Sequence, residues 1–210
     1  MFARRTLLLL VAGSIAATAG FAGNELMREK ICLVPFGRTD PKSVEALRIP
    51  IEKRFGVDVA VEKPRPVPRD AYNASREQYL STAFLNALRR KYPKNALRAL
   101  GVADVDLYVP RLNFVFGEAE MPGRVAVISL TRLRPAYYGQ PENEQIFVAR
   151  TVKEAVHELG HTFNLRHCAD SRCVMFFSNS LRDTDRKSAD FCTICAGKLS
   201  NVGSTSGISM

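Results

Sequence analysis

All three histidines of this 210-residue chain lie within eleven consecutive residues, between His157 and His167. The segment reads His-Glu-Leu-Gly-His-Thr-Phe-Asn-Leu-Arg-His. Residues i and i+4 share one face of a helix, so His157 and His161 can direct their ring nitrogens at a single metal ion. The fold must therefore hold this helix against its core by an apolar stripe, which we assign to Val152, Ala155, Val156, Leu159 and Phe163.

A third ligand at His167 requires this helix to end first. His167 follows His161 by six residues, so a continuous helix would place it on a different face. We expect a sharp turn with positive φ near Asn164, because Asn adopts that conformation more easily than any residue except Gly. We expect the helix to begin near Val152, with Thr151 and Glu154 forming a capping box.

Glu158 lies one residue beyond His157, about 100° around the helix, close to the metal without needing to bind it. Zinc at catalytic sites favours three protein ligands and an open position for water. It lowers the pKa of that water towards about 7, and a nearby carboxylate can accept the proton. The sequence therefore predicts zinc bound by His157, His161 and His167, with Glu158 as the catalytic general base.

A second cluster follows directly, formed by Cys168, Cys173, Cys192 and Cys195. Two close pairs separated by 18 residues fit a tetrahedral zinc site of four thiolates. Two disulfides are the alternative, which a secreted protein would permit. Cys192 and Cys195 could also form a redox pair, but the βαβ context expected for such a pair is missing. We favour zinc, because this part of the chain has few helix or strand patterns and needs a cross-link. The fifth cysteine, Cys32, is predicted to be a buried thiol in the first strand.

Residues 1–22 have the layout of a secretory signal peptide. Arg4 and Arg5 precede an uncharged, apolar run over residues 6–23 that ends in small residues. An uncleaved membrane anchor is the alternative, but the Ala, Gly, Ser and Thr content makes the run weakly hydrophobic for a membrane span. We therefore expect residues 23–210 to form the mature domain outside the cytoplasm, secreted or periplasmic, and membrane-anchored only if the segment is retained.

The formal net charge is +9, and removal of the two arginines of residues 1–22 leaves about +7. The Lys and Arg residues are scattered, with no long basic run. This pattern is typical of a solvated surface of mixed charge, and together with secretion it argues against nucleic acid as a partner. A hydrophobic content of 46% and a charged content of 24% are those of an ordinary folded domain.

The remaining patterns predict a single compact α/β domain with a mixed sheet. Asp40 and Pro41 are typical of a helix start, and this helix should run towards Gly56 with an interruption at Pro50. Ser75 and Gln78 resemble a capping box for a helix with Leu80, Ala83, Phe84 and Ala87 on one face. Strands are expected at residues 31–35, 57–61, 105–116 and 124–130.

The histidine and cysteine motifs together resemble the archaemetzincins, a branch of the metzincin metallopeptidases. Their pattern is His-Glu-x-x-His-x-x-Gly-x-x-His-Cys, a Cys after four residues, a Met two further on, and a distant Cys-x-x-Cys. This chain matches it at His157, Glu158, His161, His167, Cys168, Cys173, Met175, Cys192 and Cys195, with Asn164 in place of the Gly. Weaker similarity extends upstream, so that the resemblance covers most of residues 23–210.

The resemblance implies a metzincin-like fold and two zinc ions per chain, one catalytic and one structural. It also implies that Met175 lies beneath the histidines, and that an edge strand, assigned here to residues 124–133, aligns an extended peptide.

The function expected is hydrolysis of peptide or protein substrates by zinc-activated water. Aminopeptidase and endopeptidase activity both remain open, as does the oligomeric state. The alternative is a secreted zinc-binding or peptide-binding module without catalysis, which would have no need of Glu158.

Overall fold

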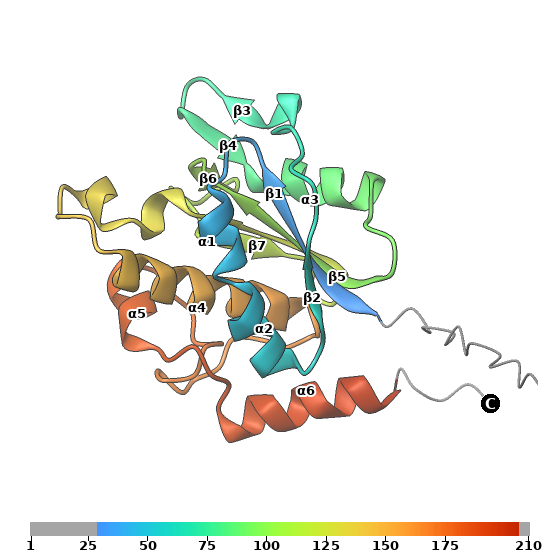
Figure 1. The fold of residues 1–210 in the computed structure, drawn as a ribbon. Helices are drawn as coiled ribbons and strands as arrows, with labels where there is room; N and C mark the ends of the chain where they lie inside the picture. Colours follow the sequence, from blue (N-terminus) through green and yellow to red (C-terminus); the bar gives the residue numbers. More distant parts are fainter. Residues whose placement is uncertain (1–28, 206–210) are drawn as a thin grey trace, which may run out of the picture.

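The computed structural model describes residues 29–205, so the predicted signal peptide at residues 1–22 lies outside the described residues. No helix in the described range combines the length and hydrophobicity of a membrane span. The predicted α/β fold with a mixed sheet is confirmed (Figure 1). The strands of the main sheet, in spatial order, are β2 (Val59–Val61), β1 (Lys30–Phe36), β5 (Ala96–Ala103), β8 (Val125–Ser129) and β7 (Gly117–Ala119).

The first four of these strands run parallel, and β7 pairs antiparallel with β8 at one edge. Side chains alternate along β1, β5 and β8, which builds one apolar core on each face of the sheet. Helix α3 (Ser81–Arg90) packs on one face through Phe84 and Leu88. Helices α1 (Pro41–Glu45), α2 (Arg48–Phe55) and α4 (Glu144–Thr162) pack on the other (Figure 1).

A smaller sheet lies beside the main one and contains β3 (Tyr72–Asn73), β4 (Gln78–Leu80) and β6 (Leu107–Tyr108). Three 3-10 helices, η1 (Arg69–Ala71), η2 (Thr131–Leu133) and η3 (Pro135–Tyr138), connect the larger elements. The C-terminal part adds α5 (Leu181–Arg186) and α6 (Thr193–Thr205), where the sequence predicted little regular structure.

The predicted helix from Asp40 to Gly56 is two helices. The Asp40 carboxylate accepts hydrogen bonds from the backbone N–H groups of Lys42 and Ser43, as an N-cap does. The chain breaks at residues 46–47 and restarts as α2, which places Pro50 in a first turn where its missing N–H costs nothing. Gly56 ends α2 at a φ of 65°.

Two other predictions were wrong. Ser75 and Gln78 do not cap a helix, because Gln78 begins β4 and α3 starts only at Ser81. Residues 105–116 are not one strand but the short β6 followed by a loop, and the longest strand of the sheet, β5, was missed. Strand β5 is rich in Ala and Leu, so its composition does not favour a strand, whereas its burial between β1 and β8 does.

Candidate active site

Helix α4 carries the first part of the site and begins eight residues before the predicted start. The side chain of Asn143 accepts a hydrogen bond from the Ile146 N–H and caps the helix. Thr151 and Glu154 therefore lie inside the helix and form no capping box, which corrects that prediction. The Thr151 hydroxyl donates to the Phe147 carbonyl instead, and Glu154 is buried, at 2% exposure.

The helix ends where the third histidine requires it to. Asn164 has a φ of 65°, which confirms the predicted left-handed turn. The backbone N–H of Leu165 then reaches the Gly160 carbonyl, at 3.1 Å, and closes the end of the helix. The turn reverses the chain and brings His167 back to His157 and His161.

The three histidines converge, with one ring nitrogen from each lying within 4.8 Å of the others. The Nε2 atoms of His157 and His161 are 3.1 Å apart. Two nitrogens bound to one tetrahedral zinc would be separated by about 3.3 Å, given Zn–N bonds of roughly 2.0–2.1 Å. The donor set and its spacing therefore fit zinc.

The opposite nitrogens of two rings face backbone carbonyls. The Nδ1 atom of His157 lies 2.8 Å from the Val174 oxygen, and that of His161 lies 2.7 Å from the Leu165 oxygen. A carbonyl can only accept, so each Nδ1 carries the proton and each Nε2 keeps its lone pair for a metal. Burial lowers the pKa of His157 and His161, the latter to about 4, which favours the neutral form that binds metal.

Glu158 is 6% exposed and lines the same cleft as the histidines. Burial raises the pKa of its carboxyl well above the usual value, and the nearby Glu154 raises it further. Gly117 of β7 provides the space, because a Cβ atom there would lie 2.5 Å from Glu158 Cγ. Sequence reasoning missed Gly117, since no motif around it marks a contact with a residue 41 positions away.

The cleft has a volume of about 390 Å³ and three walls. Helix α4 forms one wall, the loop before β7 forms the second, and the chain after α4 forms the third. The side before β7 contains Leu112, Asn113, Phe114, Val115 and Phe116, and the opposite side contains His167, Phe177, Ser178 and Asn179. Apart from His167, sequence reasoning missed both side walls, because they come from loops without periodic pattern.

Two further buried side chains lie against helix α4 near the histidines. Met175 is fully buried and packs on α4 at Gly160, where a Cβ atom would lie 2.5 Å from Met175 Sδ. Lys187 is also buried, and its Nζ lies 3.1 Å from Glu154 Oε1 and 3.5 Å from His157 Nδ1. The Thr184 hydroxyl donates to the same Glu154 oxygen at 3.1 Å.

The four predicted cysteines form the second cluster. Their sulfur atoms all lie within 4.8 Å of one another, and the Sγ atoms of Cys168 and Cys192 are 3.8 Å apart. All four are free thiols, and a disulfide would need an S–S distance of about 2.05 Å. Sulfurs bound to one tetrahedral zinc are separated by about 3.8 Å, so this set also fits a zinc ion. Cys32 is separate and fully buried in β1, as predicted.

The chain is similar in sequence to proteins of one peptidase family. The sequence model of Peptidase family M54 matches residues 55–201. The chain is 43% identical over 178 residues to Archaemetzincin of Methanocaldococcus jannaschii, and the aligned residues cover 85% of this chain and 97% of the relative. It is 44% identical over 181 residues to Archaemetzincin of Pyrococcus furiosus, covering 82% and 93% of the two chains.

Solved structures give the same result. The crystal structure of Archaemetzincin from Methanopyrus kandleri superimposes with a TM-score of 0.76 at 41% identity, over 85% of this chain and 97% of the other. The Archaeoglobus fulgidus protein, crystallised with malonate, gives a TM-score of 0.70 at 42% identity, over 80% and 99% of the two chains.

Proposed function

The chain belongs to peptidase family M54, the archaemetzincins, and is a zinc metallopeptidase that acts on peptides or proteins; we propose that His157, His161 and His167 hold its catalytic zinc and that Glu158 is the general base. The observation that carries the proposal is the buried Glu158 carboxylate in the cleft of the three histidines.

Zinc bound by the three imidazoles would supply a Lewis acid and a water of lowered pKa. The Glu158 carboxylate would accept and hold a proton in the cleft, which is the role its raised pKa suits. A carboxyl group buried in the cleft also keeps the proton near the reacting bond until the leaving amine takes it. The Nδ1–H bonds to the Val174 and Leu165 carbonyls hold two of the imidazoles in place meanwhile.

We propose that β7 aligns the substrate. It is the outermost strand of the sheet on the side of the cleft, and Gly117 and Ala119 line that cleft. An extended peptide can add to such an edge through backbone hydrogen bonds. The prediction that residues 124–133 provide the edge was wrong, because β8 pairs on both sides, with β5 and with β7.

We propose a second, structural zinc bound by Cys168, Cys173, Cys192 and Cys195. Support comes from the mutual spacing of the four sulfurs and from the backbone N–H of Cys192, which points at Cys173 Sγ at 3.3 Å. Such N–H···S contacts stabilise a thiolate.

We further propose that residues 1–22 direct the chain out of the cytoplasm and are removed. The support is the layout of the sequence alone, with a basic start, an apolar run and a small-residue exit. N-terminal sequencing of the protein recovered from culture medium or periplasm tests this, and an intact Met1 would contradict it.

The first test is to count zinc by elemental analysis together with free thiols on residues 23–210. Two zinc ions per chain, with four of five thiols protected until chelation, are expected. Glu158→Gln should retain both ions and lower kcat by about 10²–10⁴-fold, because the general base is lost. Glu144→Gln, in the exposed first turn of the same helix, is the matched control. Unchanged hydrolysis in Glu158→Gln would favour a non-catalytic role for this carboxylate.

A further inference from the structure

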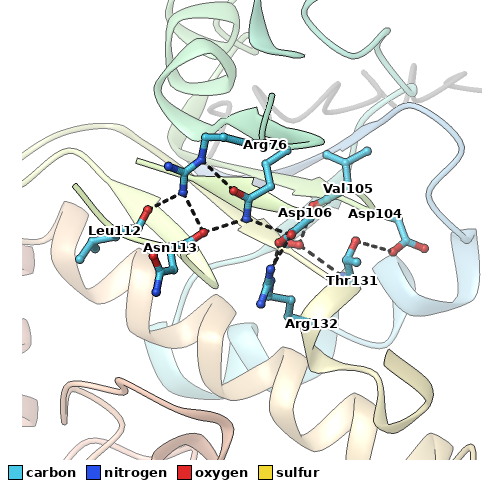
Figure 2. A network of polar contacts seen from close by, with 10 residues as sticks. Arg76, Asp104, Val105, Asp106, Leu112, Asn113, Thr131 and Arg132 are labelled. Atoms are coloured by element: carbon cyan, nitrogen blue, oxygen red, sulfur yellow. Dashed lines mark hydrogen bonds and ion pairs between the residues drawn. The ribbon is translucent and has the colours of Figure 1, made fainter. Parts of the chain in front are cut away.

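The wall of the cleft before β7 is held by a polar network that comes from a different part of the chain. We call this wall, residues 112–116, the rim. Within it, the guanidinium Nη2 of Arg76 donates to two adjacent carbonyls, those of Leu112 at 2.7 Å and Asn113 at 2.9 Å (Figure 2). Arg76 lies in the turn between β3 and β4, far from the rim in sequence.

Gln78 extends the network inward. Its side-chain Oε1 accepts from Arg76 Nε at 2.9 Å, and its Nε2 donates to the Asn113 carbonyl at 2.9 Å. The same Nε2 donates to Asp106 Oδ2 at 3.0 Å. Gln78 is 5% exposed, so its own amide group is shielded from water and the loss of a partner is costly.

The network returns to the rim through Arg132. Its guanidinium makes a two-bond contact with Asp106, at 2.6 and 2.7 Å, as Figure 2 shows. The same guanidinium lies 4.2 Å from the centre of the Phe114 ring. Neighbouring rim residues are thus fixed in two ways, Asn113 by its backbone carbonyl and Phe114 by its side chain.

The network has a direct consequence for the cleft. The carbonyls of Leu112 and Asn113 are occupied by donors outside the cleft, while the Phe114 side chain is held at its wall. Arg111, the residue directly before the rim, has a φ of 77°, a strained conformation that needs such contacts to persist. None of the four polar side chains of the network lines the cleft itself.

From this we infer that Arg76 and Gln78 are positioning residues for the substrate: they set the rim against which a peptide lies, without contributing to the zinc site. The inference rests on the proposed peptidase function of the cleft. It predicts that loss of Arg76 weakens binding of a peptide and leaves binding of a small zinc ligand unchanged.

The test uses two hydroxamates on the zinc-loaded protein. Acetohydroxamate can contact only the metal and its immediate surroundings, whereas acetyl-prolyl-leucyl-glycine hydroxamate also lies along the cleft. Arg76→Met keeps the apolar stem and removes the donors. It should weaken binding of the peptidyl hydroxamate about tenfold, as expected for lost charge-assisted hydrogen bonds, and acetohydroxamate by less than about twofold. With a peptide substrate, KM should rise by a similar factor and kcat should change little.

Gln78→Leu is the second variant, and it should act in the same direction. Arg69→Met, an exposed arginine on the neighbouring η1, is the control. Amide hydrogen exchange of residues 109–116, measured on the metal-free protein, should be faster in Arg76→Met than in the control.

The outcomes separate the inference from the proposed function. If the wild-type protein binds the peptidyl hydroxamate no better than acetohydroxamate, the peptide-binding cleft is wrong, and the inference falls with it. If the wild type discriminates and both variants match it, only the inference is overturned. Equal loss for both ligands, or loss of zinc, would also overturn it, because the network would then support the metal site.

Discussion

The histidine cluster and the cysteine cluster lie next to each other in sequence, joined at His167 and Cys168, yet they are built differently. The histidines offer three ligands in the lining of a cleft, with a buried carboxylate beside them. The cysteines offer four ligands, and the carboxylate that lines the pocket beside them, that of Asp170, is exposed. Three ligands leave zinc a position for water, and four close it. On the proposed assignment, ligand number alone therefore separates the catalytic zinc site from the structural one.

The two clusters also differ in how the protein shifts the pKa values of their side chains. Burial lowers the pKa of the histidines, so they are neutral and ready to bind at neutral pH. Among the thiols the shifts oppose each other: the Cys195 N–H lowers the pKa of Cys192 to about 7, while burial raises the pKa of Cys195. A bound cation would favour the thiolate state of all four cysteines, because it stabilises each deprotonated sulfur.

The largest expected effect tests this division directly. Cys195→Ser should remove one zinc ion and lower the free energy of unfolding by about 5 kcal/mol or more, because structural zinc contributes folding energy. His161→Gln should remove the other ion and all activity, with less than half that loss of stability. Zinc counts and urea unfolding of both variants measure the comparison. Equal losses of stability would mean that the histidine site is as structural as the cysteine site.

The second prediction concerns the buried ion pair that lies next to the histidine cluster. The buried Lys187–Glu154 pair joins α4 to the chain after α5, directly behind His157. Lys187→Met leaves the Glu154 carboxylate buried and unpaired, which should cost about 3–5 kcal/mol. The double variant with Glu154→Leu should recover most of that loss in urea unfolding, because neither charge remains. No recovery would mean that packing, and not charge pairing, explains the loss.

The histidine and cysteine patterns predicted much of the candidate site, because metal ligands follow fixed spacing on a helix and around a turn. Asn164 is the clearest case, since the need for His167 to return to the metal predicts the positive φ that Asn164 adopts. Glu154 shows the limit. Its sequence context suggested a cap, but its partner Lys187 lies 33 residues away, and no local pattern reports a tertiary ion pair.

The same limit explains the errors in the fold. Strand β5 consists largely of residues that favour helices, and it is a strand because β1 and β8 supply hydrogen bonds on both sides. Gln78 follows Ser75 at the spacing of a capping box, yet its side chain reaches Asp106 and Asn113 instead. Where several distant segments compete for one side chain, local propensity decides little.

The third prediction compares a glycine near each cluster. A Cβ atom at Gly117 would lie 2.5 Å from Glu158 Cγ and 2.7 Å from the Val127 carbonyl, whereas one at Gly197 would meet nothing within 4 Å. Gly117→Ala should displace Glu158 and cost about 1–3 kcal/mol, with kcat reduced about tenfold or more and zinc retained. Gly197→Ala, in α6, should leave activity unchanged and stability the same or slightly higher. Full activity in Gly117→Ala would show that Glu158 has freedom to move.

The smallest expected effect is the pH dependence of the free energy of unfolding of the metal-free protein. The pKa of His161 falls from 6.5 unfolded to about 4 folded, owing first to burial. A lowered pKa gives stability that is fully present above pH 6.5 and is lost as the pH falls towards 4, because only the unfolded chain then binds the proton. The raised pKa of Glu158 acts with the opposite sign, giving stability that is lost as the pH rises above about 4.5.

The contributions of His161 and Glu158 oppose each other over overlapping pH ranges. The measurement is therefore made on the Glu158→Gln variant, in which this side chain no longer titrates. There the free energy of unfolding of the chelated protein should rise with pH between 4 and 6.5, and adding His161→Gln should flatten part of that rise. The pKa values of Cys192 and Cys195 lie above this range, so the flattened part belongs to the histidine cluster. An unchanged slope would mean that the imidazole of His161 is exposed to water when zinc is absent, and that its burial depends on the metal.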